Sequence, residues 1–203
     1  LTLADLEQRL ERFATKEAWL DARRAGIGGS EAAAILNEHP WRSAFELYHL
    51  KRGNLEPDNA DENEAMLWGS ILEEPVRKEY VRRTGRRIVH VPNSLLRHPE
   101  HPFLFASLDG IILDGDGPAV WGIYEGKTAS AYKARDWQDD PPIYYQIQVQ
   151  HALAVTGLRR GSFGTLVGGQ KFVGPLDVER NDPFIAAMLA RLGRDPRWRL
   201  WLA

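Results

Sequence analysis

Ser107-Leu108-Asp109-Gly110, followed beyond a glycine- and aspartate-rich turn by Glu125-Gly126-Lys127, is the stretch around which this sequence is organised. It predicts two antiparallel strands. Because side chains alternate across a strand, Glu125 and Lys127 point to one side and Gly126 to the other, and pairing across the turn brings Asp109 opposite Glu125. Burying these charges costs free energy unless a partner neutralises them, and a divalent metal would do so. We interpret the stretch as a metal-dependent site that cleaves phosphodiesters.

The composition is that of an ordinary globular protein. The 203 residues are 43% hydrophobic and 27% charged, which predicts one domain, 1–203, with a continuous core. No apolar run is long enough to span a bilayer and no secretory leader is evident, so we expect a soluble, cytoplasmic protein without a membrane partner. The absence of cysteine excludes disulfides, thiol nucleophiles and iron–sulfur clusters.

The net charge of -2 argues against a protein that binds nucleic acid along its whole surface. Basic residues nevertheless cluster, for example at Arg23-Arg24 and at Arg82-Arg83 with Arg86-Arg87. A solvated helix face explains any one of these clusters as well as a binding site does.

The order of predicted elements is that of an α/β or α+β protein with helices flanking a mixed sheet, and we expect the α/β class. The pattern of apolar residues and caps predicts helices over 3–13, 16–24, 31–36, 43–53, 64–84, 143–156 and 183–192. It predicts strands over 87–91, 104–113, 119–128, 161–167 and 171–178. Pro75 should kink or break the long helix. We treat His98 and His101 as loop surface, and we expect the tail tryptophans, Trp198 and Trp201, to pack in the core.

The loop Gly28-Gly29-Ser30 precedes a helix-favouring run, with Ser30 as the expected N-cap. A glycine-rich turn that leads into a helix N-terminus suits an anion such as phosphate, and Arg23 lies a few residues upstream. The alternative is a plain tight turn.

Several short stretches occur together in one order. They are 27–36, Trp68-Gly69 with Leu72-Glu73, 106–110, Gln148-Val149-Gln150 and Val155-Thr156-Gly157. With Asp109 and Glu125-x-Lys127, they resemble the YqaJ-type viral recombinase family, the family of phage lambda exonuclease, within the PD-(D/E)xK nuclease superfamily. The resemblance covers about 19–180 and implies a restriction-endonuclease-like α/β core. Two positions depart from the pattern: Leu108 replaces the proline, and Gly126 replaces an aliphatic residue.

The resemblance implies roles for particular residues. Asp109 and Glu125 match metal ligands, with the Gly126 carbonyl as a further ligand, and Glu73 matches a helix carboxylate that contacts the metal. Lys127 matches the lysine that orients the attacking water, and Gln148 matches a glutamine that holds the site. Arg23 and Ser30 match positions that bind the terminal 5′-phosphate, with Arg24 as the alternative to Arg23.

The implied activity is Mg²⁺-dependent digestion of linear double-stranded DNA from 5′ to 3′, leaving 3′ strands for recombination by annealing, with Mn²⁺ as a substitute. A homotrimeric ring and a single-strand annealing partner are implied in the same way. Two alternatives remain: an endonuclease of the same superfamily in restriction or repair, and a nuclease-inactive DNA-binding or assembly module.

Overall fold

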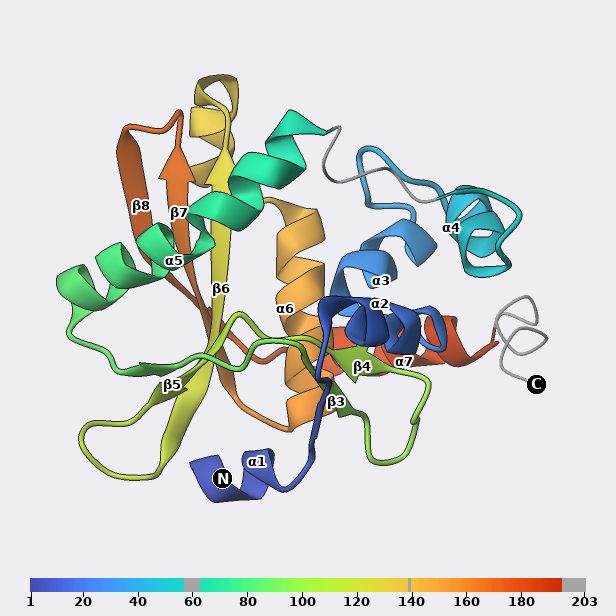
Figure 1. Ribbon diagram of the computed structural model, residues 1–203, viewed down its shortest axis with the longest axis horizontal. Coiled ribbons are helices and arrows are strands. Elements are labelled where there is room, and N and C mark those ends of the chain that lie inside the picture. The colour runs from blue at the N-terminus through green and yellow to red at the C-terminus, as the bar shows by residue number, and fades with distance from the viewer. Residues whose placement is uncertain (57–62, 139, 195–203) are drawn as a thin grey trace.

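The computed structural model describes residues 1–56, 63–138 and 140–194. Figure 1 shows a central sheet with helices on both sides. The helices are α1 (Leu3–Glu7), α2 (Lys16–Arg24), α3 (Gly29–Ile35), α4 (Ala44–Lys51), α5 (Glu64–Thr84), α6 (Ile143–Thr156) and α7 (Asp182–Arg194), with a 3₁₀ helix at Ala131–Trp137. The strands are β1 (Leu10–Arg12), β2 (Ile88–Val89), β3 (Ser94–Arg97), β4 (Phe105–Ala106), β5 (Gly110–Leu113), β6 (Val120–Ala129), β7 (Arg160–Val167) and β8 (Lys171–Glu179).

The five-stranded sheet has the order β2-β5-β6-β7-β8. Its pairs are antiparallel except for β6 and β7, which run parallel and are joined by α6. A parallel pair needs such a crossover connection. The predicted mixed α/β sheet with flanking helices is therefore confirmed.

A second sheet, with the order β1-β3-β4, corrects three predictions. The first predicted helix ends at Glu7, and the following residues form β1, which pairs with β3. The segment expected to be a loop around His98 contains β3, and His98 is buried. The strand predicted over 104–113 is broken, because β4 belongs to the small sheet and β5 to the large one.

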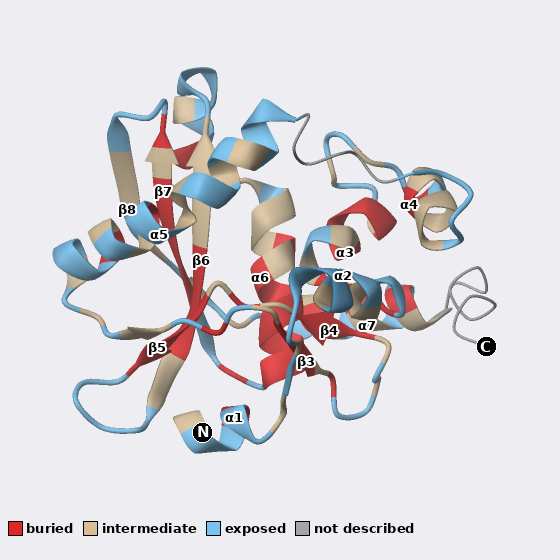
Figure 2. Cartoon of the chain, viewed as in Figure 1, coloured by how far each residue is buried: buried red, intermediate tan, exposed pale blue. Residues whose placement is uncertain are grey.

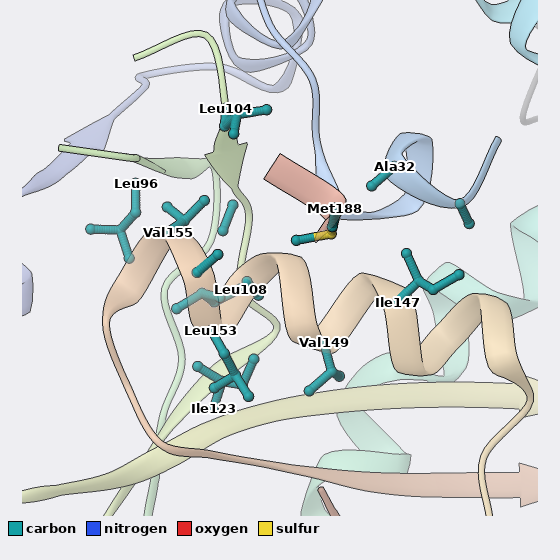
Figure 3. Packing of buried hydrophobic residues seen from close by; sticks show 14 of the residues in the cluster. Ala32, Leu96, Leu104, Leu108, Ile123, Ile147, Val149, Leu153, Val155 and Met188 are labelled. Atoms are coloured by element: carbon teal, nitrogen blue, oxygen red, sulfur yellow. The ribbon is translucent and has the colours of Figure 1, made fainter. Parts of the chain in front are cut away.

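The core lies around α6, which is buried along most of its length (Figure 2). Figure 3 shows its side chains reaching in several directions: Val149 and Leu153 toward Ile123 of β6, and Ile147 toward α3. Because α6 is packed on several sides, its first polar residues are held rigidly.

Helix ends follow the cap residues in the sequence. Thr2, Thr15 and Ser43 each accept a hydrogen bond from a backbone N–H in the first turn of their helix. The helix α5 ends at Gly85, whose φ of 68° a residue with a side chain rarely adopts. Pro75 does not break α5, which runs unbroken from Glu64 to Thr84.

Trp198, Trp201 and part of the acidic segment before α5 lie outside the described residues. Within the described ranges, none of the helices has the length and apolar character needed to cross a bilayer.

Candidate nuclease site

Strand β6 presents its residues to two different helices. Tyr124 faces α5, because its ring centroid lies 4.9 Å from that of Tyr80. Lys127 faces α6, because its Nζ donates to Oε1 of Gln148 at 3.3 Å. Glu125 shares the side of Lys127, as the alternation of side chains predicts. The end of β6 is thus reached by side chains from both helix layers.

The break between β4 and β5 places Asp109 at this end of β6. Gly110 pairs with Tyr124, and the next residue toward the break is Asp109. Its Oδ2 accepts a hydrogen bond from the Gly126 N–H at 2.9 Å. The predicted proximity of Asp109 to the Glu125-Gly126-Lys127 segment is confirmed.

Glu125, Lys127 and Gln148 form a hydrogen-bonded group. The Lys127 ammonium donates to Oε1 of Glu125 at 2.7 Å, and Nε2 of Gln148 donates to the same oxygen. Burial, together with the charge of Asp109, raises the pKa of Glu125 to about 7. Burial acts to lower the pKa of Lys127, but the carboxylates of Glu125 and Asp109 outweigh it and raise that pKa. Lys127 therefore stays charged and offsets only part of the negative charge.

Glu73 reaches the same region from α5. Burial first, and then the charge of Asp109, raise the pKa of its carboxyl. Arg77 lies one turn further along α5, 3.8 Å from Glu73, and its Nη1 is 2.8 Å from Nδ1 of His90. That imidazole nitrogen is in turn 3.2 Å from the backbone carbonyl oxygen of Asp109. Sequence reasoning missed Arg77 and His90, since nothing in the local sequence indicates that they meet.

The residues present fit a divalent metal ion. Asp109 and Glu125 offer hard carboxylate oxygens, which magnesium prefers. Burial and the charge of Asp109 both raise the pKa of Glu125, so a cation beside this carboxylate would stabilise its charged form. Within residues 1–56, 63–138 and 140–194, however, three or more His, Cys, Asp or Glu side chains do not converge as a metal-binding group. The reason is that Glu73 approaches from the α5 side of the sheet and Glu125 faces α6. Asp109, Glu125, the Gly126 carbonyl and Glu73 are the oxygen-bearing groups around this end of β6.

The packing around β6 explains why residue 126 is a glycine. A Cβ at this position would lie 3.1 Å from the hydroxyl oxygen of Tyr124, which occupies the space of a side chain. The aromatic ring two residues earlier thus replaces the aliphatic residue expected between the acid and the lysine.

Arg23 lies close to this site. Its Nη1 donates to the Ser107 hydroxyl at 3.4 Å, two residues before Asp109, and its guanidinium packs on the Trp19 ring at 4.6 Å. Arg24 instead is exposed and pairs with Asp21 at 3.4 Å. Of the two neighbouring arginines, Arg23 is the one directed toward the Asp109 segment.

The loop before α3 differs from the prediction in one respect. Gly28, not Ser30, is the N-cap, and its N–H donates to the Glu31 carboxylate at 2.8 Å. Ser30 lies in the first turn and is exposed. The glycine at 29 is required because a Cβ there would lie 2.9 Å from the carbonyl oxygen of Gln148. The loop is thereby packed against the segment that holds Gln148.

A cleft of about 860 Å³ opens at the end of β6. Glu73, Asp109, Gly126 and Lys127 line it, whereas Glu125 is only 3% exposed beneath it. Further lining residues come from 39–42, from the start of α5 and from the start of α6. Glu73 and Asp109 are therefore accessible from the cleft, and Glu125 is recessed.

Known proteins resemble this chain in sequence and in fold. Residues 18–159 match the YqaJ-like viral recombinase domain. The uncharacterized protein YqaJ of Bacillus subtilis (strain 168) is 40% identical over 174 residues, which is 84% of this chain, and the chain spans 52% of that protein's length.

Two solved structures of the alkaline exonuclease LHK-Exo from Laribacter hongkongensis match 92% of both chains at 22% identity. Their TM-scores are 0.68 and, for the complex with dAMP, 0.69. The fold is thus of the PD-(D/E)xK type found in that exonuclease. With most of its length matched by the domain, the chain belongs to the YqaJ-like viral recombinase family.

Proposed function

We propose that this protein is a Mg²⁺-dependent exodeoxyribonuclease that digests linear double-stranded DNA from the 5′ end and leaves 3′ single strands. Family membership and fold support a nuclease role. The single observation that carries the proposal is the convergence of Asp109, Glu125, Lys127 and Gln148 at the floor of an open cleft.

In this mechanism each residue has a separate task. Asp109 and Glu125, with the Gly126 carbonyl, would hold the metal ion, and Glu73 would supply a further carboxylate. A bound divalent ion would lower the pKa of a water and offset charge that develops on the scissile phosphate. Lys127, held charged by Glu125, orients the attacking water and faces the same phosphate. Gln148 fixes Glu125 and Lys127 relative to each other through its amide.

The direction of digestion depends on which end of the DNA strand the protein binds. Arg23 and Ser30 bind the terminal 5′-phosphate in this proposal, because Arg23 offers a guanidinium close to Ser107 and the Asp109 segment. An arginine fork binds a phosphate through paired N–H donors, and a phosphate outcompetes a neutral hydroxyl as its partner.

The test uses end-labelled linear duplexes and closed circular DNA of the same sequence, incubated with Mg²⁺ or with chelator. We expect linear DNA with a 5′-phosphate to shorten from that end, Mn²⁺ to replace Mg²⁺, and circular DNA to persist. Cleavage of the circle would indicate an endonuclease, and no release of nucleotides at all would indicate a DNA-binding or assembly module. Equal rates on 5′-phosphate and 5′-hydroxyl ends would remove Arg23 and Ser30 from end recognition.

Metal binding is tested separately from cleavage, by the melting temperature of the protein. Adding Mg²⁺ to chelator-treated protein should raise the melting temperature, because a ligand that binds only the folded state stabilises it by about 2.7 kcal/mol at a hundredfold excess over Kd. The shift should vanish in Asp109→Asn. A shift of equal size in that variant would place the ion elsewhere.

The assembly implied by the family, a trimeric ring with a single-strand annealing partner, remains a proposal. Light scattering of the purified chain, alone and with a duplex, tests the ring.

A further inference from the structure

Three aromatic rings form a group at the cleft that the proposed chemistry does not use. His39 and Trp41 come from the turn between α3 and α4, and Tyr144 from the first turn of α6. The Trp41 centroid lies 5.7 Å from that of His39 and 5.6 Å from that of Tyr144, and both contacts are edge-to-face. We call these three residues the aromatic rim. All three line the cleft.

Trp41 is exposed, with 65% of its surface accessible, although burial would stabilise so large an apolar ring. It is also held in place. Its backbone N–H donates to Nδ1 of His39 at 3.3 Å, and Pro40 between them limits the backbone. Burial, and then the charge of Arg42, lower the pKa of His39, so its ring is neutral at physiological pH and accepts this bond. The rim is therefore an exposed aromatic surface with a fixed shape.

The rim is continuous with the catalytic end of the cleft. The Tyr144 ring lies 4.3 Å from that of Tyr145, and Nζ of Lys127 lies 4.7 Å above the Tyr145 ring. Aromatic faces thus follow one wall of the cleft from Lys127 to Trp41. Basic side chains of Arg42 and Lys133 line the same cleft, which favours a polyanion as occupant.

We propose that the aromatic rim stacks against unpaired bases of the strand whose phosphate lies at Asp109. This proposal rests on the proposed function and adds a base-stacking surface beside that site. Every base has a π face, so stacking on aromatic side chains accepts any sequence, and a positively charged groove follows the backbone. The aromatic rings and two basic side chains, Arg42 and Lys133, are present along this cleft, with Lys133 3.2 Å from Asp136.

The experiment measures binding of a short 5′-phosphorylated, fluorescein-labelled oligothymidylate by anisotropy, in chelator so that the strand is not cut. A second probe has the same backbone with abasic residues. Trp41→Ala should weaken binding of the oligothymidylate about tenfold, the expected loss for one stacked base, and leave the abasic probe unchanged. Trp41→Phe should restore most of the affinity. Phe45→Ala is the matched control, because Phe45 is 68% exposed but packs on His49 instead.

Equal binding of both probes by the wild type, or equal weakening of both by Trp41→Ala, would overturn the proposal. A change in molecular mass with Trp41→Ala at unchanged affinity would assign the rim to contacts between subunits and overturn it as well. The proposed function fails separately: wild-type protein that releases no nucleotides but prefers the base-bearing probe would keep the rim as a base-stacking surface without an exonuclease.

Discussion

Two polar clusters lie on the central sheet, and the pKa values of their carboxyl groups are shifted in opposite directions. The paired cluster consists of Tyr80, Arg86, Ser162 and Asp177. Arg86 donates two hydrogen bonds of 2.7 Å to Asp177, and the Tyr80 hydroxyl donates to Ser162 at 2.8 Å. Ser162 completes the group by donating to Asp177 at 2.6 Å.

The carboxylate cluster consists of Glu73, Asp109 and Glu125. It has more negative than positive charge, and the pKa values of Glu73 and Glu125 are raised, whereas the pKa of Asp177 is lowered. Burial acts to raise the pKa of Asp177 too, but Arg86 and Ser162 outweigh it. The contrast teaches that a carboxylate whose hydrogen-bond partners outweigh its desolvation stabilises the fold, and one whose pKa stays raised despite its partners is available to bind a cation.

The largest expected effect is on cleavage by Asp109→Asn. Loss of a metal ligand removes several kcal/mol of transition-state stabilisation, so the rate should fall about a thousandfold. Stability without metal should not decrease, because asparagine keeps an oxygen for the Gly126 N–H and removes a charge beside Glu125.

The matched control is Asp177→Asn in the paired cluster, measured by the same DNA digestion and urea unfolding. It should lower the free energy of unfolding and leave the rate intact. If both variants lose cleavage, or both lose stability, the assignment of different roles to the two clusters is wrong.

His151 belongs to neither the paired cluster nor the carboxylate cluster, and it is fully buried and neutral. Among the described residues its ring nitrogens have no hydrogen-bond partner. Burial, with a smaller effect from His98, lowers its pKa to about 4. The unfolded state therefore binds the extra proton first, and this group should cost about 3 kcal/mol of stability as the pH falls from 6.5 to 4.

Urea unfolding at several pH values tests this expectation, with His151→Leu as the comparison. The variant should lose much of the acid sensitivity and keep its cleavage rate at neutral pH. An unchanged slope of stability against pH would show that other groups, such as His98, dominate acid unfolding.

The smallest effects are expected for two arginine variants, Arg86→Ala and Arg160→Ala. Arg86→Ala has the larger effect of the two. It removes the partner of Asp177 and of the Tyr80 hydroxyl, and since the side chains are partly exposed we expect a loss of about 2 kcal/mol. Arg160→Ala, which breaks a more exposed pair with Glu179, should cost less than about 1 kcal/mol. Thermal unfolding of both variants, with cleavage as a second measurement, checks the order. Reversal of that order would contradict the assignment of a structural role to the paired cluster.

The sequence predicted best what local chemistry determines. The bounds of α5 and α6 were correct because Gly85 and Gly157, both with positive φ, end them. The proximity of Asp109 to the Glu125-Gly126-Lys127 segment followed from strand pairing and alternation. Gln148 was indicated by the family resemblance, and it lies within hydrogen-bond distance of Lys127.

What failed depended on contacts between distant segments. Leu10 has helical spacing with Leu6, yet it lies in β1 because pairing with Leu96 outweighs the local preference. The strand break before Gly110 follows from two sheets competing for one segment. Arg77, His90 and the aromatic rim were missed because their partners lie far away in sequence.

The break between β4 and β5 also limits how far apart Ser107 and Asp109 can lie. Ser107, which Arg23 contacts, and Asp109 are two residues apart, a span of at most ~7 Å along an extended chain. Under the proposed function, the end-binding Arg23 is thus held near the cutting Asp109 through its hydrogen bond to Ser107. The distance between these two groups would then determine the length of the released nucleotide product. An insertion at Leu108 would lengthen that distance and change the product.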